Sequence, residues 1–311
     1  MTGLLPLDLL SYDFMRRALL AALLVGALAP AVGSYLVQRR QALIGDGIGH
    51  VALTGVGLGL VFRTSPVWMA VLVCVLAAVV MELVRARGHQ RGDLALAMLF
   101  YGGMACGRLL ISKAPAAGGS AGSLDGYLWG SILAVDTGDL VTIAVLGALV
   151  LAVTLGLRRQ LFAVCQDEEF ARVTGVPVRL LNLLLAVLAA VTVTVAMRVV
   201  GLLLVSALMV VPVAAAQLLT RSFRATQVLA IGLGVAVSLG GVVTSYQADV
   251  PPGSAIVLLA IAVFALLGAL AAPLARRRHR RTPGPGPVRP ELGPAPGARG
   301  PAGGGGWHNE V

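Results

Sequence analysis

A carboxylate and an imidazole stand four residues apart near the start of an apolar segment. They are Asp46 and His50, in the stretch Leu43-Ile-Gly-Asp-Gly-Ile-Gly-His-Val51. On a helix, residues at this spacing share one face. A carboxylate and an imidazole together suit borderline or hard divalent cations such as Zn²⁺, Mn²⁺ or Fe²⁺. The spacing therefore indicates a metal site on a helix.

Two other roles are compatible with the same residues. Asp46 could cap the N-terminus of the helix, and His50 could form an ordinary hydrogen bond between helices. Two ligands are also only half of a usual four-ligand zinc site. The other histidines, His89, His279 and His308, lie in predicted loop or tail segments. A histidine-dependent site must therefore use His50 or take ligands from a second chain.

The sequence lacks the signatures of ATP hydrolysis and of zinc proteolysis. It contains no G-x-x-x-x-G-K-[ST] motif, and its only lysine is Lys113, so it has no phosphate-binding loop of that type. It also contains no H-E-x-x-H motif, which argues against a metalloprotease. We expect that the chain is not an enzyme and that any ATP hydrolysis occurs on another chain.

The composition identifies the environment in which these side chains must be positioned. The chain has 311 residues, of which 58% are hydrophobic and only 12% charged, whereas soluble proteins carry about 25% charged residues. Mean hydropathy is +0.89. These values exclude a soluble globular domain and a disordered chain, and they indicate a polytopic membrane protein. The net charge of +10 then reflects membrane orientation and anionic lipid rather than nucleic-acid binding.

Nine apolar segments approach the length of about 20 residues that a transmembrane helix requires. The sixth and seventh are separated only by Arg198 and its neighbours, so eight spans with one broken helix is the alternative. The prediction is an all-α bundle of about 8–9 transmembrane helices. The segment 127–135 is too short to span, and its Tyr and Trp predict an interfacial or re-entrant helix. The nine segments are 16–37, 46–62, 66–84, 93–112, 139–157, 179–197, 199–219, 226–246 and 254–272.

Small residues recur at four-residue spacing within several of these segments. This spacing lets helices approach closely in a membrane, where small side chains are enriched at helix contacts. It predicts a compact bundle. The pairs are Gly45 with Gly49, Gly55 with Gly59, and Gly232 with Ala236.

The arginines predict the orientation of the bundle. When loops are assigned to alternate sides of the bilayer, one side receives most of the arginines, and the positive-inside rule places that side and the C-terminus in the cytoplasm. Arg16 and Arg17 do not fit this pattern, so the side of the N-terminus stays open. Residues 1–275 form the predicted membrane domain, and the basic, Pro/Gly-rich tail 276–311 is predicted to be disordered.

Several further charged residues lie mostly near the ends of the predicted spans. At such positions they are expected to anchor helix ends and to extend toward the interface. A buried role stays open for Asp93 and Arg198. The whole group is Glu82, Asp93, Arg108, Asp136, Asp139 and Arg198.

The loop 158–179 is predicted to hold a short helix between two spans. Acidic residues come first, an arginine follows and Gly-x-Pro closes the segment, which is the order expected of a capped helix. It is either a surface connector or a docking helix for a cytoplasmic partner, with Phe170 as the apolar anchor. The candidate docking residues are Asp167, Glu168, Glu169, Phe170, Arg172 and Gly175.

Five stretches of the chain, in this order, resemble blocks of the membrane permeases of zinc/manganese-type ABC transporters, the ABC-3 family. The resemblance covers roughly residues 10–275, and residues 276–311 look like an extension. By this resemblance Asp46 and His50 match the family's metal-transit position, and 167–175 match its ATPase-coupling segment. The blocks are Val37–His50, Tyr127–Leu133, Asp167–Arg172, Ala196–Leu208 and Pro251–Leu258.

The resemblance implies the membrane subunit of a bacterial divalent metal importer in the plasma membrane. Two copies would form a homodimer on separate cytoplasmic ATP-binding subunits, and an extracytoplasmic metal-binding protein would deliver the ion. Closure of the ATPases would move the coupling segment and alternate access to the site. Zn²⁺ or Mn²⁺, and iron as a further candidate, would be cargo. No permanently bound cofactor and no nucleic-acid partner are expected.

Three other functions compete with this interpretation. A proton-coupled secondary transporter would work without an ATPase, and inverted repeats would favour it. A permease for metal chelates would need no ligating pair. A membrane scaffold that does not transport would tolerate changes at Asp46 and His50.

Overall fold

The computed structural model describes residues 12–114, 124–131 and 135–279. Within these residues the secondary structure is helical and contains no strand. Eight of the helices are long and apolar enough to cross a membrane, which confirms the predicted all-α membrane bundle. The chain divides into two compact units, Met1–Ala271 and Ala272–Val311. The predicted disorder of the tail concerns mainly residues 280–311, which lie outside the described part.

Each of the nine predicted segments coincides with a helix, and most ends agree within a few residues. The main difference is at the seventh segment, which begins at residue 205 rather than 199 and is a shorter apolar helix of 15 residues. The helices are α2 (Asp13–Gln38), α3 (Ile44–Val61), α4 (Pro66–Arg85), α5 (His89–Lys113), α7 (Thr137–Gly156), α10 (Val178–Val200), α11 (Val205–Leu219), α12 (Phe223–Ala248) and α13 (Pro252–His279).

The break between α10 and α11 is built around Gly201. This residue has φ +86°, and a Cβ there would lie 2.4 Å from the Leu128 carbonyl oxygen, so only glycine fits. The backbone N–H of Leu202 donates to the Tyr127 carbonyl at 2.9 Å. The short helix α6 (Leu124–Trp129) is therefore attached to the break. The end of the predicted interfacial segment, 132–134, lies outside the described residues.

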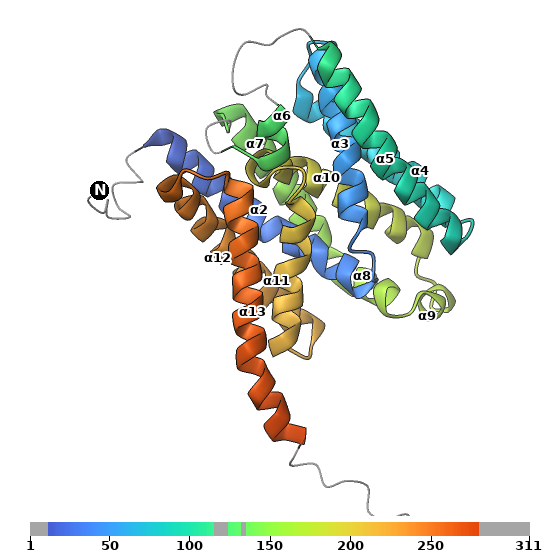
Figure 1. The fold of residues 1–311 in the computed structure, drawn as a ribbon. Coiled ribbons are helices and arrows are strands. Elements are labelled where there is room, and N and C mark those ends of the chain that lie inside the picture. The colour runs from blue at the N-terminus through green and yellow to red at the C-terminus, as the bar shows by residue number, and fades with distance from the viewer. Residues whose placement is uncertain (1–11, 115–123, 132–134, 280–311) are drawn as a thin grey trace, which may run out of the picture. The chain divides into compact units, whose positions relative to one another are not determined.

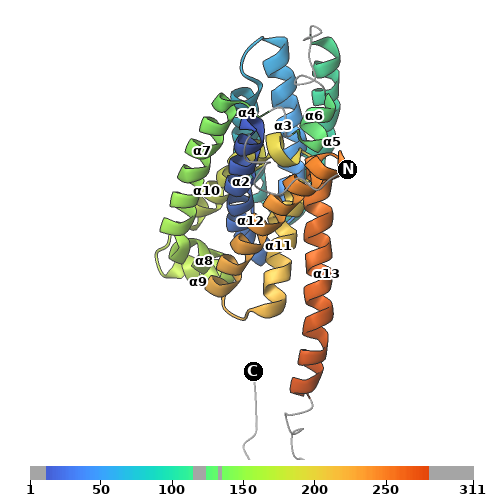
Figure 2. The same ribbon diagram turned by 90° about the vertical axis from the view of Figure 1, so that its left-hand side faces the viewer.

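Helix α3 is central to the first unit. It packs against α4 and α5, which lie beside it in Figure 1, and also against α10 and α11. Helix α2 packs against α12, α11, α7 and α10. Two short helices, α8 (Arg158–Gln166) and α9 (Glu168–Val173), lie toward the end of the unit opposite to α6, as Figures 1 and 2 show from two directions.

Close helix contacts occur at glycines, as predicted, but not at all of the predicted positions. A Cβ at Gly55 would lie 2.4 Å from Ala70 Cα, and one at Gly59 would lie 2.6 Å from Pro66 Cα, both on α4. Gly232 has open space around it, so its predicted role was wrong. Helices α2 and α12 instead cross at Gly26 and Gly234, where a Cβ on Gly26 would lie 2.7 Å from the Gly234 carbonyl oxygen.

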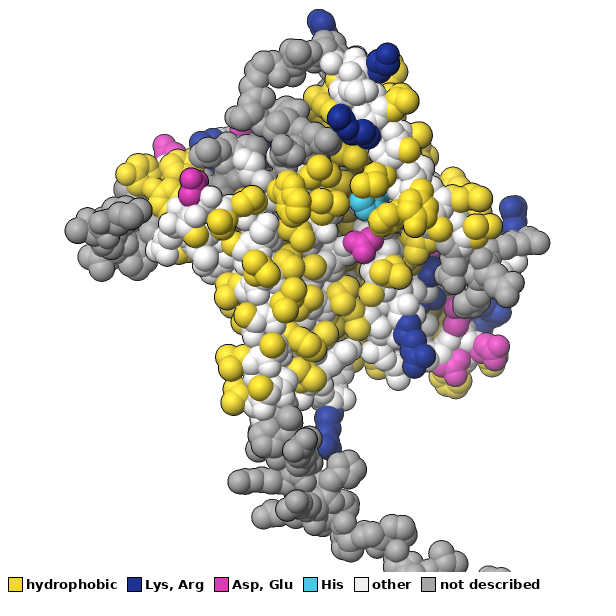
Figure 3. All heavy atoms as spheres, viewed as in Figure 1, with side chains coloured by type: hydrophobic (Ala, Val, Ile, Leu, Met, Phe, Trp, Pro, Cys, Tyr) yellow, Lys and Arg dark blue, Asp and Glu magenta, His cyan; other side chains and the backbone are white. Residues whose placement is uncertain are grey.

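The outer surface of the bundle is apolar, as a lipid-facing surface requires. Figure 3 shows hydrophobic side chains over the middle of one face, with acidic and histidine side chains partly visible among them. Large apolar side chains are exposed along α4 and α5, including Leu72, Leu76, Met98 and Tyr101. In water this exposure would be costly, whereas in a bilayer it is the expected state.

Candidate metal site

Helix α3 positions both predicted ligands in its first two turns. Its N-cap is Leu43, whose side chain forms no capping hydrogen bond, and Asp46 lies in the first turn. A carboxylate at this position is favoured by the positive end of the helix dipole. Asp46 and His50 are one turn apart on the same helix, so their side chains are neighbours.

The carboxylate of Asp46 is held by a residue 160 positions away in sequence. The Ser206 hydroxyl of α11 donates a short hydrogen bond to Asp46 Oδ1. Ser206 is buried and Asp46 is half-buried. The alternative in which Asp46 caps α3 was therefore wrong, because the carboxylate faces α11 rather than the N-terminal amides of its own helix.

The imidazole of His50 is buried without a hydrogen bond. Only 7% of the residue is exposed, and Nδ1 has no partner among the described residues. The ring contacts Phe100 of α5 edge-on, with 4.1 Å between centroids. The alternative in which His50 forms an ordinary hydrogen bond between helices is thus not observed. A buried polar atom without a partner costs about 1–3 kcal/mol, which a ligand can recover.

Glycines bring the neighbouring helices close to these two residues. A Cβ at Gly103 of α5 would lie 2.8 Å from the His50 carbonyl carbon. A Cβ at Gly49 would lie 3.5 Å from the carbonyl oxygen of Leu202, in the break before α11. Backbone carbonyls in such interrupted membrane helices are available to cations. The site therefore lies between α5, α3 and the unwound segment.

The donor set is incomplete for a permanent metal centre. Among the described side chains, no three or more His, Cys, Asp or Glu residues are grouped so that they could hold a metal ion. One chain offers a carboxylate, an imidazole and the Ser206 hydroxyl, whereas structural zinc sites use four strong ligands. Such a set suits an ion that must both enter and leave, since transport requires binding that is not too strong.

A second polar cluster joins α7 to α10. Arg198 forms an ion pair with Asp139 at 2.5 Å, and both side chains are largely buried. The guanidinium also lies 5.4 Å from the centre of the Tyr127 ring. Asp136 accepts a hydrogen bond from the Asp139 backbone and caps α7. The buried role left open for Arg198 is confirmed, whereas the expectation that Asp139 only anchors a helix end was wrong.

The remaining charged residues of that group have different positions. Glu82 is buried and pairs with Arg85 at 3.0 Å, so it is not a simple interfacial anchor. Arg108 is exposed on α5, as expected of a snorkelling residue. The side chain of Asp93 lies outside the described part of the chain.

The predicted short helix between two spans is confirmed as α9, preceded by α8. The Asp167 carboxylate accepts a hydrogen bond from the Phe170 N–H at 2.9 Å and so caps α9. Glu168 pairs with Arg172 and with Arg39, each at 3.3 Å. Gly175 ends the segment with φ +81°, a conformation that favours glycine.

The surface of α9 combines acids with exposed apolar side chains. Phe170 is 66% exposed and Val173 is 87% exposed, and Glu169 is also exposed. Beneath this surface, burial raises the pKa of the Cys165 thiol to about 11, partly offset by the nearby Arg39. That thiol is therefore protonated at neutral pH and chemically inert.

Sequence reasoning did not identify Ser206 or Phe100 as parts of the candidate site. Ser206 lies within one of the five blocks, but it stands 160 positions from Asp46, and nothing in its local pattern shows that contact. Phe100 lies in an apolar run and carries no signal of its own. For Ser206, the one signal in the sequence is a polar residue near the start of an apolar helix.

The fold and the buried polar pair define the class of this molecule, a multi-pass membrane protein with ionisable residues between its spans. Residues 11–271 match the sequence profile of the ABC 3 transport family. The chain therefore belongs to this family, and it is a membrane-spanning transport component. The resemblance drawn from the five blocks is thereby confirmed.

Individual relatives cover nearly the same length. The chain is 35% identical over 263 residues to a probable metal transport system membrane protein of Treponema pallidum, covering 84% of this chain and 97% of the relative. It is 34% identical over 259 residues to the manganese transport system membrane protein MntC of Halalkalibacterium halodurans, covering 83% and 88%. A solved structure of PsaBC from Streptococcus pneumoniae in complex with Fab is similar, with TM-score 0.75, 30% identity, and coverage of 84% of this chain and 92% of that chain.

Proposed function

We propose that the chain is the permease subunit of an ATP-driven importer of a divalent transition metal ion. Zinc and manganese are the first candidates for cargo, and iron is the third. Membership of the ABC 3 transport family supports this function. The name of the Halalkalibacterium halodurans relative, a manganese transport protein, makes manganese the first ion to test.

The observation that carries the proposal is the buried His50 Nδ1 without a partner, one turn from the Asp46 carboxylate. An ionisable residue at membrane depth is costly and is retained where it has a function. Asp46 and His50 would bind the ion in transit, with a neutral imidazole and an ionised carboxylate. Water or backbone oxygens would complete the coordination, as hard and borderline cations accept.

Energy would come from partner chains. Since the sequence has no phosphate-binding loop, ATP would be hydrolysed on a separate cytoplasmic subunit. Helix α9 supports docking of that subunit, because it presents Phe170 among acidic side chains. Residues 167–175 would transmit ATPase closure to the bundle, and an extracytoplasmic binding protein would deliver the ion. The outer and inner sides would then open alternately.

The assembly would be a homodimer in the plasma membrane with the C-terminus in the cytoplasm. Exposed apolar side chains along α4 and α5 provide surface for lipid or for a second copy. Arg39, Arg158, Arg159 and Arg172 belong to the end of the unit that carries α8 and α9. The positive-inside rule favours that end as the cytoplasmic one.

The test is metal accumulation in cells that express the chain with its ATP-binding subunit and binding protein. We expect uptake of manganese, zinc or iron to fall to background in Asp46→Asn and in His50→Ala, with normal membrane levels of both variants. Asp249→Asn is the matched control, since Asp249 ends α12 in a left-handed conformation that asparagine also tolerates. Normal uptake by both site variants would refute the transit site.

A second arm separates this function from secondary transport. The phosphate-binding lysine of the ATP-binding subunit is replaced, and uptake is measured again. An ATP-driven importer loses uptake, whereas a proton-coupled transporter retains it. Uptake that survives this change would overturn the ATP-driven mechanism while leaving the metal site in place.

A further inference from the structure

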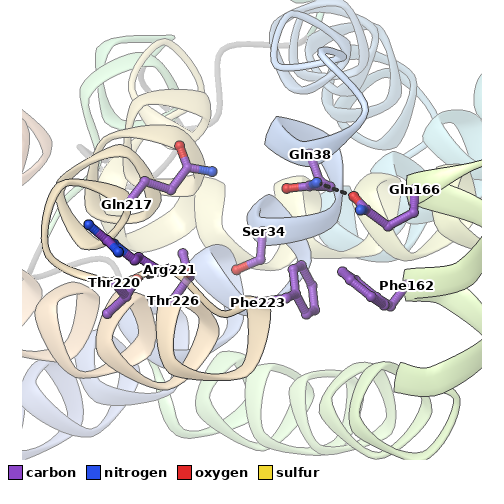
Figure 4. Close-up of a pocket in the computed structure, with 9 residues that line it drawn as sticks. All are labelled: Ser34, Gln38, Phe162, Gln166, Gln217, Thr220, Arg221, Phe223 and Thr226. Atoms are coloured by element: carbon purple, nitrogen blue, oxygen red, sulfur yellow. Dashed lines mark hydrogen bonds between the residues drawn. The ribbon is translucent and has the colours of Figure 1, made fainter. Parts of the chain in front are cut away.

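Two adjoining cavities open between α8 and the turn that joins α11 to α12. The inner cavity measures about 290 Å³ and the outer one about 470 Å³. Phe162, Arg221 and Phe223 line both of them, so the two cavities share a wall. Figure 4 shows side chains from α2, α8, α11 and α12 gathered around the inner cavity.

The inner cavity is lined mainly by neutral groups that form hydrogen bonds. Its amides can donate and accept, whereas its three hydroxyls already donate to backbone carbonyls and keep acceptor capacity. Only one contact joins two of the amides, from Gln38 Nε2 to Gln166 Oε1 at 2.5 Å, drawn as a dashed line in Figure 4. The neutral lining residues are Ser34, Gln38, Gln166, Gln217, Thr220 and Thr226.

The outer cavity is strongly basic and uncompensated. It is lined by Arg158, Arg159, Arg221 and Arg224. None of these guanidinium groups forms a hydrogen bond or ion pair within the described residues. The acids closest in sequence to α8 are already engaged, since Asp167 caps α9 and Glu168 pairs with two other arginines. An anion would therefore meet four arginines that have no competing partner.

The outer cavity also has an apolar wall. Phe162 and Phe223 stack with 4.7 Å between their ring centroids. Arginine is the residue best suited to phosphate, because its planar group presents several donors at once. A cavity that pairs arginines with aromatic side chains suits a phosphate that is attached to an organic group.

The cavities lie beside the turn that joins the apolar helices α11 and α12, and the ends of membrane-spanning helices are where lipid headgroups are expected. Arg158 begins α8 two residues after the end of the apolar helix α7, Arg221 lies in the turn between α11 and α12, and Arg224 lies in the first turn of α12. Exposed apolar side chains lead away from this turn into the membrane-spanning part. They are Leu155, Leu218, Leu219 and Val228, each 42–71% exposed. This is the surface along which acyl chains would lie.

We propose that this double cavity binds the headgroup of an anionic phospholipid. The arginines hold the phosphate, and the neutral inner chamber takes the hydroxyl groups of the headgroup, so phosphatidylglycerol is the lipid with the matching chemistry. A free glycerol phosphate shares that chemistry, but it would leave the apolar path unused. Basic pockets between membrane helices at the interface are known to hold anionic headgroups. The proposal of a lipid site does not depend on the proposed metal transport.

The test is native mass spectrometry of the full chain in detergent, titrated with phosphatidylglycerol or with phosphatidylcholine of the same acyl chains. We expect preferential binding of phosphatidylglycerol. The triple variant Arg158→Gln/Arg221→Gln/Arg224→Gln should raise its apparent Kd on the order of 100-fold, about fivefold for each arginine lost near an anionic headgroup. The matched control, Arg40→Gln/Arg87→Gln/Arg179→Gln, removes three exposed arginines elsewhere whose side chains form no ion pair or hydrogen bond within the described residues. It should bind like the native chain.

A milder variant tests the inner chamber without removing charge. Gln217→Leu should lower the preference for phosphatidylglycerol over phosphatidic acid, which lacks the second glycerol, by about fivefold for a lost hydrogen bond. Its binding of phosphatidic acid should stay unchanged. This variant also keeps the proposal testable if the triple variant does not fold.

Five outcomes would overturn the proposal. They are the absence of any preference for phosphatidylglycerol, an equal loss in both triple variants, and an unchanged lipid preference in Gln217→Leu. The fourth is displacement of the lipid by free glycerol 3-phosphate at similar concentration, which would make the site one for a soluble phosphate. If the purified ATP-binding subunit displaces the lipid and needs the same arginines to bind, the cavity is a protein contact and the proposal also fails.

Discussion

The Asp46–His50 site and helix α9 differ in which groups lack contacts among the described residues: a buried polar atom at the site, and an exposed apolar side chain on α9. At the site, His50 is buried and its Nδ1 has no partner in the described part of the chain. At α9, Asp167 and Glu168 both have partners, and the unusual feature is instead the exposed aromatic ring of Phe170. Within the described ranges, the site therefore lacks a polar contact for His50, whereas α9 lacks an apolar contact for Phe170.

The difference indicates what each region binds. A buried polar atom without a partner costs free energy that an ion can restore. An exposed aromatic side chain costs little in the isolated chain, but it gains free energy when a protein surface covers it. Substitutions at the Asp46–His50 site should therefore affect metal binding alone, and substitutions on α9 should affect partner binding alone.

The largest expected effect is that of His50→Ala on metal binding. Loss of one of two strong ligands should weaken Mn²⁺ binding at least about 100-fold, since even outer-shell changes cost 10–100-fold. We would measure bound metal by mass spectrometry on the full chain in nanodiscs. Binding of the ATP-binding subunit should not change. Joint loss of both activities would remove the distinction between the two regions.

Phe170→Ala should weaken binding of the ATP-binding subunit by about 2 kcal/mol, or about 30-fold in Kd. The variant should unfold at the native temperature, because the side chain is 66% exposed. Phe62→Ala is the control, since Phe62 is 65% exposed at the far end of α3. Equal weakening by both variants, measured by surface plasmon resonance, would show that α9 is not the docking surface.

Gly103→Ala should destabilise the chain by about 1–3 kcal/mol, the usual cost of overpacking. The new Cβ would lie 2.8 Å from the His50 backbone, so α5 must move away from α3. Gly102→Ala is the control one residue away, where a Cβ meets nothing within 4 Å. Thermal unfolding followed by fluorescence should separate the two. If they behave alike, α3 and α5 are not closely packed at the site.

Glu168→Gln should have the smallest effect, at most about 1 kcal/mol. Its carboxylate is 41% exposed and pairs with Arg39 and Arg172, and such pairs contribute little in water. The loss should shrink further in high salt because screening already weakens the native pairs. A destabilisation of several kcal/mol would mean that α9 is held as firmly as the metal site.

The local features of the molecule could be predicted from its sequence. Apolar length located the spans, and the order of acids, Arg172 and Gly175 predicted the capped helix α9. The start of α11 was missed because its boundary depends on a contact of Gly201 with Leu128, a long-range interaction. For the same reason the pattern around Asp46 could not show that this residue is not a helix cap, since the evidence against a cap is its long-range contact with Ser206.

Residue type and spacing were sufficient to place Asp46 and His50 one turn apart on a helix, whereas their role in metal transit stays a prediction. The two partners that complete their surroundings, Ser206 and Phe100, come from other helices. Their side chains are common in membrane bundles, so neither stands out in the sequence. Only the packing of α3 against α5 and α11 brings them to the site.

The glycines of α3 have a consequence for the stability of the site. The helix contains six glycines in 18 residues, which in water would cost an isolated helix about 5 kcal/mol relative to alanine. Its folded state must therefore be maintained by α4, α5, α10 and α11, against which it packs. When those helices separate during a conformational change, the amides of the first turns of α3 should be among the first to exchange with solvent. The candidate ligands Asp46 and His50 thus lie on a helix whose order depends on its neighbours.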